Sequence, residues 1–149
     1  MTRPCFLMAF IIALFVGCSQ PPKHTEAERL QMIREVYTLQ FRAVKQKYLN
    51  QSDTIQLITY DTPTRKELWR QAARNLWAIS KEARQLQPPA AFTLANESLI
   101  KAADAFDGAA RILNEKELPL FDALLYVETG IKYLYSGELA LANANLTDG

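Results

Sequence analysis

Histidine and cysteine are scarce in this chain: its 149 residues include one His and two Cys. No Glu-x-x-His, Cys-x-x-Cys-His or Gly-x-Ser-x-Gly occurs, which excludes di-iron bundle chemistry, covalent haem attachment and the α/β-hydrolase nucleophile. The single His24 precedes the first predicted helix, where no core would orient its ring. We therefore predict no catalytic residue, no metal site and no cofactor, and a protein that is not an enzyme.

An excess of charge of one sign is also missing, because 17 Lys and Arg balance 16 Asp and Glu to a net charge of +1. A nucleic-acid partner is excluded, since it would require a strongly basic surface. Five Gly and seven Pro are too few for a collagen-like or low-complexity chain. With 49% hydrophobic residues, the length suits one small domain with a single packed core.

The N-terminal residues have the composition of an export signal. Residues 1–18 read MTRPCFLMAFIIALFVGC, with one charge, Arg3, before an apolar run from Cys5 to Gly17. A helix of that run would rise only ~20 Å, short of the ~30 Å hydrocarbon core of a membrane. A short basic segment followed by a compact apolar run is typical of an exported protein.

The end of this run, Leu14-Phe15-Val16-Gly17-Cys18, resembles the lipobox of small bacterial lipoproteins. The resemblance implies a signal peptide over residues 1–17, cleavage between Gly17 and Cys18, and a lipid on the Cys18 thiol that anchors the protein to a membrane. Phe15 stands where the family usually has Leu. Ser19, in place of Asp, implies the outer membrane facing the periplasm rather than the inner membrane. Two alternatives are an ordinary secretory signal that leaves Cys18 as a free thiol, and an uncleaved N-terminal anchor.

After a tether over residues 18–24, apolar residues recur at three- and four-residue steps, which predicts amphipathic helices. Their expected ranges are 26–50, 64–87, 89–114 and 119–146. Thr25 with Glu28, and Thr64 with Glu67, match the capping box that begins a helix. The sequence therefore predicts an all-α fold, an antiparallel up-down four-helix bundle over residues 25–149, preceded by a cleaved signal helix and the tether.

Each predicted helix has an apolar stripe that should face the core. The stripes of the first and fourth helices are Leu30, Ile33, Tyr37, Phe41, Val44 and Tyr48, and Leu120, Leu124, Val127, Ile131, Leu134 and Leu141. Four positions are expected to be nearly fully buried: Leu76, Leu99, Leu124 and Ile131. Residues 51–62 are too apolar for a solvated loop, so we expect them to fold over one end of the bundle.

The segment Gln87-Pro88-Pro89-Ala90-Ala91-Phe92, followed by Asn96 and Leu99, resembles a loose pattern in small uncharacterised bacterial helical lipoproteins. The likeness covers about 25 residues and implies a helix hairpin rather than a function. Such proteins often have His where this chain has Asn96, so no role of that His carries over.

Charge is unevenly distributed along the chain. Residues 18–88 hold 12 Lys and Arg against 7 Asp and Glu, whereas residues 89–149 hold 4 against 9. A basic stripe follows the second predicted helix: Lys66, Arg70, Arg74, Lys81 and Arg84. One hypothesis is that this stripe binds an anionic surface. The other is that the basic first hairpin pairs with the acidic second hairpin and so selects the topology.

The fourth predicted helix is unusually apolar, with 18 of the 29 residues from Leu118 to Leu146 in the apolar class. Tyr126, Tyr133 and Tyr135 lie beside its core stripe. Such a helix is either widely buried within the monomer or covers a partner. In the second case the tyrosines form an interaction face for a homodimer or for another envelope protein.

Together these features indicate a lipid-anchored protein of the cell envelope whose helices serve as a non-catalytic interaction or structural module. The alternative is a carrier that binds a small apolar ligand between the helices. The candidate lining residues of that carrier are Trp69, Phe92, Phe106, Phe121 and Leu124.

Overall fold

The computed structural model describes residues 25–115 and 119–146, and within them the regular structure is helical. The elements are α1 (Glu26–Leu57), α2 (Arg65–Gln85), a 3₁₀ turn η2 (Ala90–Phe92), α3 (Thr93–Glu115) and α4 (Leu120–Leu146). No strand occurs in these ranges, so the predicted all-α class is confirmed. The predicted signal helix and tether lie outside the described residues. No helix among those described has the length and apolarity needed to cross a membrane.

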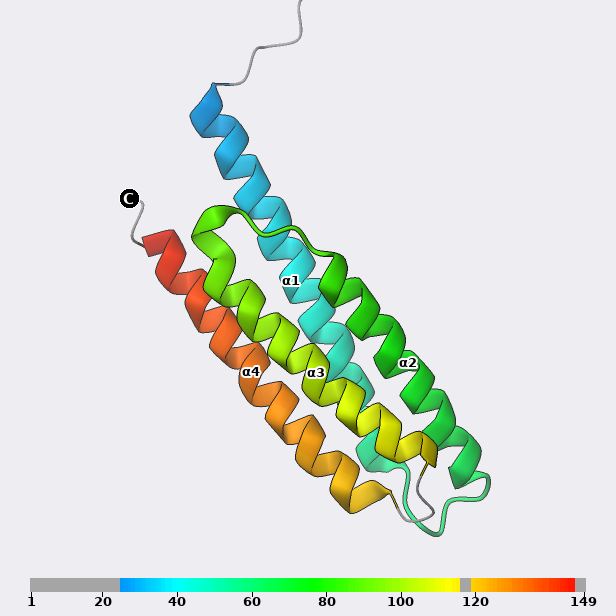
Figure 1. The fold of residues 1–149 in the computed structure, drawn as a ribbon. Helices are drawn as coiled ribbons and strands as arrows, with labels where there is room; N and C mark the ends of the chain where they lie inside the picture. The colour runs from blue at the N-terminus through cyan, green and yellow to red at the C-terminus, as the bar shows by residue number, and fades with distance from the viewer. Residues whose placement is uncertain (1–24, 116–118, 147–149) are drawn as a thin grey trace, which may run out of the picture.

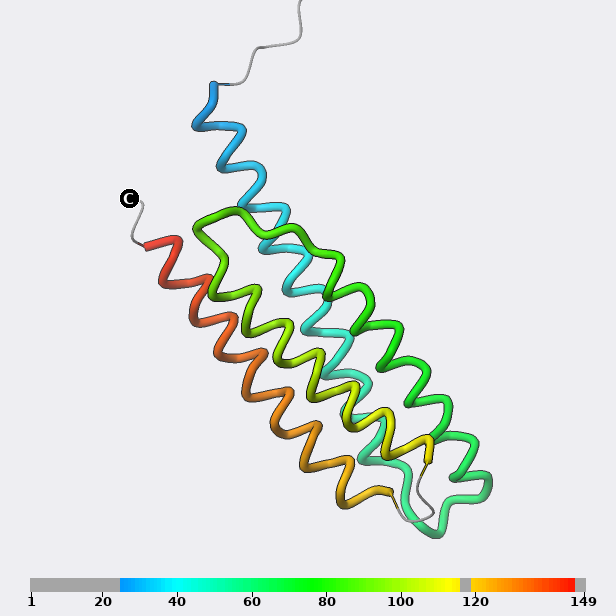
Figure 2. The backbone as a smooth tube through the Cα atoms, viewed as in Figure 1, coloured from blue at the N-terminus to red at the C-terminus, as the bar shows by residue number. Residues whose placement is uncertain are grey.

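The long helices lie side by side, and each runs opposite to the one before it (Figures 1 and 2). Contacts join α1 to α2, α2 to α3, α3 to α4 and α4 back to α1. The most extensive contact is between α3 and α4. Neighbours along the chain are therefore neighbours in space, as short connections favour.

The core lies along the axis between the helices and is rich in aromatic side chains. Tyr37, Phe41 and Tyr48 enter it from α1, Trp69 from α2 and Phe106 from α3, all at most 1% exposed. The rings of Tyr48 and Phe106 stack with centroids 4.0 Å apart. Leu76 and Leu99 are fully buried, as predicted.

Small residues form much of the contact between α3 and α4. Ala95, Ala102 and Ala109 are buried on α3, and Ala123, Gly130 and Gly137 are buried on α4, each set at seven-residue steps. A Cβ at Gly137 would lie 2.7 Å from Phe41 Cζ and 3.2 Å from the Ala95 carbonyl oxygen. Side chains this small allow two helix backbones to approach closely.

The stripe predicted for the fourth helix is therefore wrong in part. Leu124 and Ile131 are only partly buried, because the close approach turns Ala123, Gly130 and Gly137 inward instead. Val127, Leu134 and Leu141 are buried as predicted. Phe121, expected between the helices, is 72% exposed.

The first turns of α1 extend beyond the ends of the other helices (Figure 1). The capping box of Thr25 and Glu28 is present, as predicted. However, Tyr37 is the first buried residue of α1. Leu30 and Ile33 continue the core stripe past the point where another helix could cover them, so both are half exposed and their predicted burial is wrong.

Helix α1 also runs two turns further than predicted. Polar residues at 50–53 suggested its end, but Gln51 and Ser52 are buried with partners: Asn75 Nδ2 donates to Gln51 Oε1 at 3.0 Å, and Ser52 Oγ donates to the Tyr48 carbonyl. Ile55 and Ile58 then cover the end of the core, as expected, whereas Leu57 is 79% exposed.

The second predicted capping box does not form. Thr64 precedes α2 with φ 60°, in the left-handed region, and its side chain makes no capping hydrogen bond. A capping side chain requires an extended backbone at that position to reach the free N–H groups. The pattern Thr64–Glu67 therefore has the right residues in the wrong backbone conformation.

We expect Gly130→Ala to lower the free energy of unfolding by ~1–3 kcal/mol, the usual cost of overpacking a core. A Cβ there would lie 2.7 Å from Phe106 Cε2, and the stacked, buried Phe106 ring cannot move aside. In an unconstrained helix the same change would stabilise by ~1 kcal/mol. Urea denaturation of the two proteins measures the difference.

Gly108→Ala is the matched control. Its Cβ would lie 2.6 Å from the Tyr126 ring, but that ring is half exposed and can rotate into solvent. We expect this variant to be as stable as the wild type or slightly more stable. An equal loss at both glycines would contradict the importance of the close α3–α4 approach.

Candidate functional site

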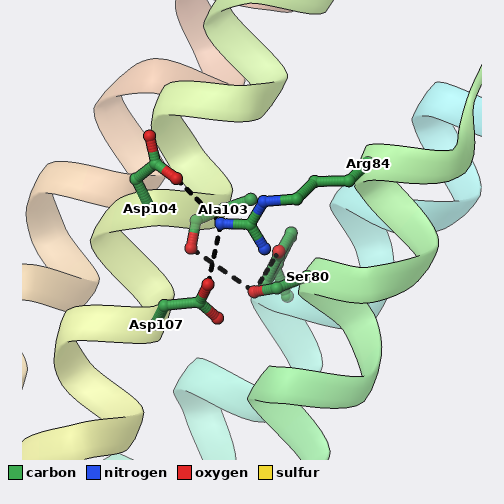
Figure 3. A network of polar contacts seen from close by, with 6 residues as sticks. Ser80, Arg84, Ala103, Asp104 and Asp107 are labelled. Atoms are coloured by element: carbon green, nitrogen blue, oxygen red, sulfur yellow. Dashed lines mark hydrogen bonds and ion pairs between the residues drawn. The ribbon is translucent and has the colours of Figure 1, made fainter.

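A polar cluster joins α2 to α3 around Arg84 (Figure 3). Arg84 Nη2 donates to Asp104 Oδ1 at 2.8 Å and to Asp107 Oδ2 at 2.7 Å. Burial lowers the pKa of the Arg84 guanidinium, but hydrogen bonds to the two carboxylates outweigh burial and leave the pKa raised. The cluster thus holds a permanently charged link between the basic and acidic halves of the chain.

A second set of hydrogen bonds lies deeper beside this cluster. Tyr48 Oη donates to Ser80 Oγ at 2.9 Å, and Ser80 Oγ donates to the Ala103 carbonyl at 3.4 Å. These bonds join α1, α2 and α3 through groups that are almost fully buried. Burial raises the pKa of Tyr48 above its usual range, so its hydroxyl stays protonated and able to donate.

Another buried tyrosine, Tyr37, has a hydrogen-bond partner on α3. Tyr37 Oη donates to Asn96 Oδ1 at 3.0 Å, which links α1 to α3. Burial raises the pKa of Tyr37 to about 12. Asn96 therefore satisfies a phenol that would otherwise be buried without an acceptor.

The acidic half also pairs with the basic half between α1 and α4. Lys45 Nζ donates to Glu138 Oε2, and Arg42 Nε lies 4.0 Å from Glu138 Oε1. The Lys45 ammonium also lies 4.1 Å from the centroid of the Tyr135 ring. Sequence reasoning missed Arg42 and Lys45, because it looked for basic partners only on the second helix.

The residues of the basic stripe on α2 differ in the partners that they bind. Arg84 pairs with the second hairpin, as the pairing hypothesis proposed, whereas Arg74 pairs with Glu67 of its own helix at 3.1 Å. Lys66, Arg70 and Lys81 are exposed. The structure therefore brings one of the five stripe residues into the cluster and leaves the others along an outer face of α2.

The three tyrosines of the predicted interaction face lie on the outside of α4. Tyr126 and Tyr133 line a groove of about 490 Å³ beside α3, together with Lys101, Asp104, Ala105, Leu125 and Thr129. Tyr135 is on the other side of α4, next to α1 and Lys45. Their rings are 37–54% exposed, so burial within the monomer does not account for them.

A ligand between the helices would have to displace packed core side chains. Trp69, Phe92 and Phe106 are buried, and Phe106 is held between Tyr48 and the backbone at Gly130. A groove of about 880 Å³ lies on the surface along the first turns of α1 and reaches Asn145 of α4. These observations give the carrier alternative no specific support.

Gly17 and Cys18, the predicted cleavage and lipidation residues, lie outside the described residues. The chain matches no model of a known protein family, and no similar curated protein or solved structure was found. The candidate sites therefore rest on the geometry given above and on the lipobox resemblance.

We expect Arg84→Gln to lower the free energy of unfolding by ~1 kcal/mol, since it leaves Asp104 and Asp107 without their common cation. Oδ1 of Asp107 is buried and has no hydrogen-bond partner within the described ranges, so that carboxylate depends on Arg84. Urea denaturation at low salt measures the loss. Lys81→Gln, an exposed position one turn earlier, is the control and should stay within ~0.5 kcal/mol of the wild type.

Raising the pH should destabilise the protein through its buried tyrosines. The folded-state pKa of Tyr37 is about 12 and that of Tyr48 is also raised, whereas both titrate near 10 when unfolded. The stabilisation that depends on their protonated form is complete below pH ~10 and is lost as the pH rises above it. Urea denaturation from pH 8 to 11.5 should show this decline. The double variant Tyr37→Phe with Tyr48→Phe should decline less steeply, and an identical slope would refute the assignment.

Proposed function

We propose that this protein is a lipid-anchored component of the cell envelope whose helices form an antiparallel up-and-down four-helix bundle. The bundle acts as a non-catalytic interaction module. The lipobox-like residues ending in Gly17-Cys18 support the anchor, and Ser19 supports the outer membrane facing the periplasm.

The interaction role is supported by the packing of α4, where several small residues are buried and several large apolar side chains are exposed. Its buried face includes Ala123, Gly130 and Gly137, whereas large apolar side chains such as Phe121 and Leu125 face outward. Exposing side chains of this size is costly unless something covers them, because their contact with water is unfavourable. The outer face of α4 is therefore the surface that we assign to a partner.

The exposed first turns of α1 support a position close to a membrane. Six residues separate Cys18 from Thr25, so the acylated end and the start of α1 stay within ~25 Å of each other. Leu30, Met32, Ile33 and Val36 are exposed in this part of α1. We assign these apolar side chains to the boundary between lipid headgroups and the bundle.

The anchor is tested by Cys18→Ala expressed in a bacterial host with an outer membrane. The wild type should fractionate with membranes, and mass spectrometry should find its N-terminus at Cys18 with attached lipid. The variant should lack the lipid and leave the outer-membrane fraction, because the acyl chains supply the stable attachment.

Cys5→Ala is the matched control, since Cys5 lies within the predicted signal peptide and would be removed. It should be lipidated and localised like the wild type. An unmodified mature N-terminus at any other residue would refute the lipoprotein assignment.

A further inference from the structure

The outer face of α4 carries a regular seam that the monomer leaves uncovered. Its members follow one another at alternating steps of four and three residues, and all are exposed: Phe121, Leu125, Glu128, Lys132, Tyr135, Leu139, Ala142 and Leu146. This is the seven-residue repeat of a helix that packs along another helix. We call these eight residues the outer seam. Helix α4 thus has two such seams, one buried against α1 and α3 and one facing solvent.

Two copies of the outer seam are complementary in charge when their helices run in opposite directions. Its two charges, Glu128 and Lys132, stand between apolar members on both sides. They form an ion pair at 2.9 Å within the helix, and both side chains are largely exposed. In an antiparallel pair of identical helices, Glu128 of one faces Lys132 of the other, and the reverse contact forms by symmetry.

The same antiparallel register also places apolar members of one seam opposite apolar members of the other. With Glu128 opposite Lys132 of a second copy, Leu125 lies opposite Tyr135, and Phe121 lies opposite Leu139. A parallel pair in register would instead place Glu128 beside Glu128 and Lys132 beside Lys132, which is repulsive. The charges therefore select the antiparallel arrangement.

We propose that the outer seam binds the outer seam of a second copy of this chain, forming an antiparallel homodimer. The inference rests on the proposed function only in assigning the outer face of α4 to a partner. The groove lined by Leu125, Tyr126 and Tyr133 runs beside the seam and receives side chains of the second copy. Phe121, Tyr135 and Leu139 are 72%, 54% and 63% exposed, and large apolar side chains of this kind dominate the area that a stable interface buries.

The antiparallel arrangement also has a consequence for the anchor. A twofold axis across α4 places the two copies of Thr25 at opposite ends of the dimer. Both lipids reach one membrane only when the helices lie along its surface rather than stand upright on it. The exposed apolar turns of α1 would then meet the lipid headgroups at both ends.

The test is charge reversal in the seam, measured on the purified mature protein in detergent by light scattering coupled to gel filtration. The wild type should be a dimer at tens of micromolar. Glu128→Lys places two lysines opposite each other twice in the dimer and should weaken dimerisation at least ~10-fold. Adding Lys132→Glu exchanges the two charges, restores complementarity, and should return the dissociation constant to within ~3-fold of the wild type.

Glu97→Lys is the matched control, because Glu97 is an exposed acid on α3 outside the seam. It should dimerise like the wild type. Circular dichroism checks that each variant keeps its helices. A monomeric wild type, or a double exchange that stays as weak as the single one, would overturn the proposal. Neither result affects the lipidation of Cys18, so failure of the dimer and failure of the anchor are distinguishable.

Disulfide formation tests the register. Leu125→Cys combined with Tyr135→Cys should give a covalent dimer on mild oxidation, since these positions face each other across the antiparallel seam. Leu125→Cys alone should not, because the two copies of position 125 are then about ten residues, or ~15 Å, apart along the helix. Efficient cross-linking of the single variant would indicate a parallel pair and contradict the proposal.

Discussion

The close approach of α3 and α4 determines how the remaining side chains are arranged. It depends on alanine and glycine at seven-residue steps, with Phe106 of α3 against Gly130 and the Ala95 carbonyl oxygen of α3 against Gly137. Since these positions accept no larger side chain, the large apolar residues of α4 cannot all turn inward. The same packing that makes the core dense therefore leaves Phe121, Leu125 and Leu139 on the outside.

The ion pairs between the two halves of the chain contribute less to the free energy of unfolding than the packed core does. In the part of the chain that the structure describes, basic residues of the first half meet acidic residues of the second half where Arg84 binds Asp104 and Asp107 and where Lys45 binds Glu138. Each partly exposed pair contributes little to stability, about 0–1 kcal/mol. The observed neighbours, α2 next to α3 and α1 next to α4, bring opposite charges together, as the pairing hypothesis predicts.

The turns assigned to the membrane boundary and the surface assigned to a partner lie on different helices, α1 and α4. The first turns of α1 lie nearest in sequence to the predicted lipid on Cys18 and have no helix beside them. The outer seam of α4 runs along the side of the bundle, where it is open to a second protein. The predicted anchor and the proposed docking surface therefore involve different residues.

The helical class, the start of α1 just after Thr25 and the burial of Leu76 and Leu99 could be predicted from the sequence, because periodicity and capping are local properties. The sequence could not show that α1 continues through Gln51 and Ser52, since the partners Asn75 and the Tyr48 carbonyl are supplied by packing. Nor could it orient α4, because hydrophobicity favours Leu124 and Ile131 over Gly130. The buried face of α4 follows from its packing against α3, since the space beside the neighbouring helix, and not the apolarity of the residue, selects Ala123, Gly130 and Gly137 for burial.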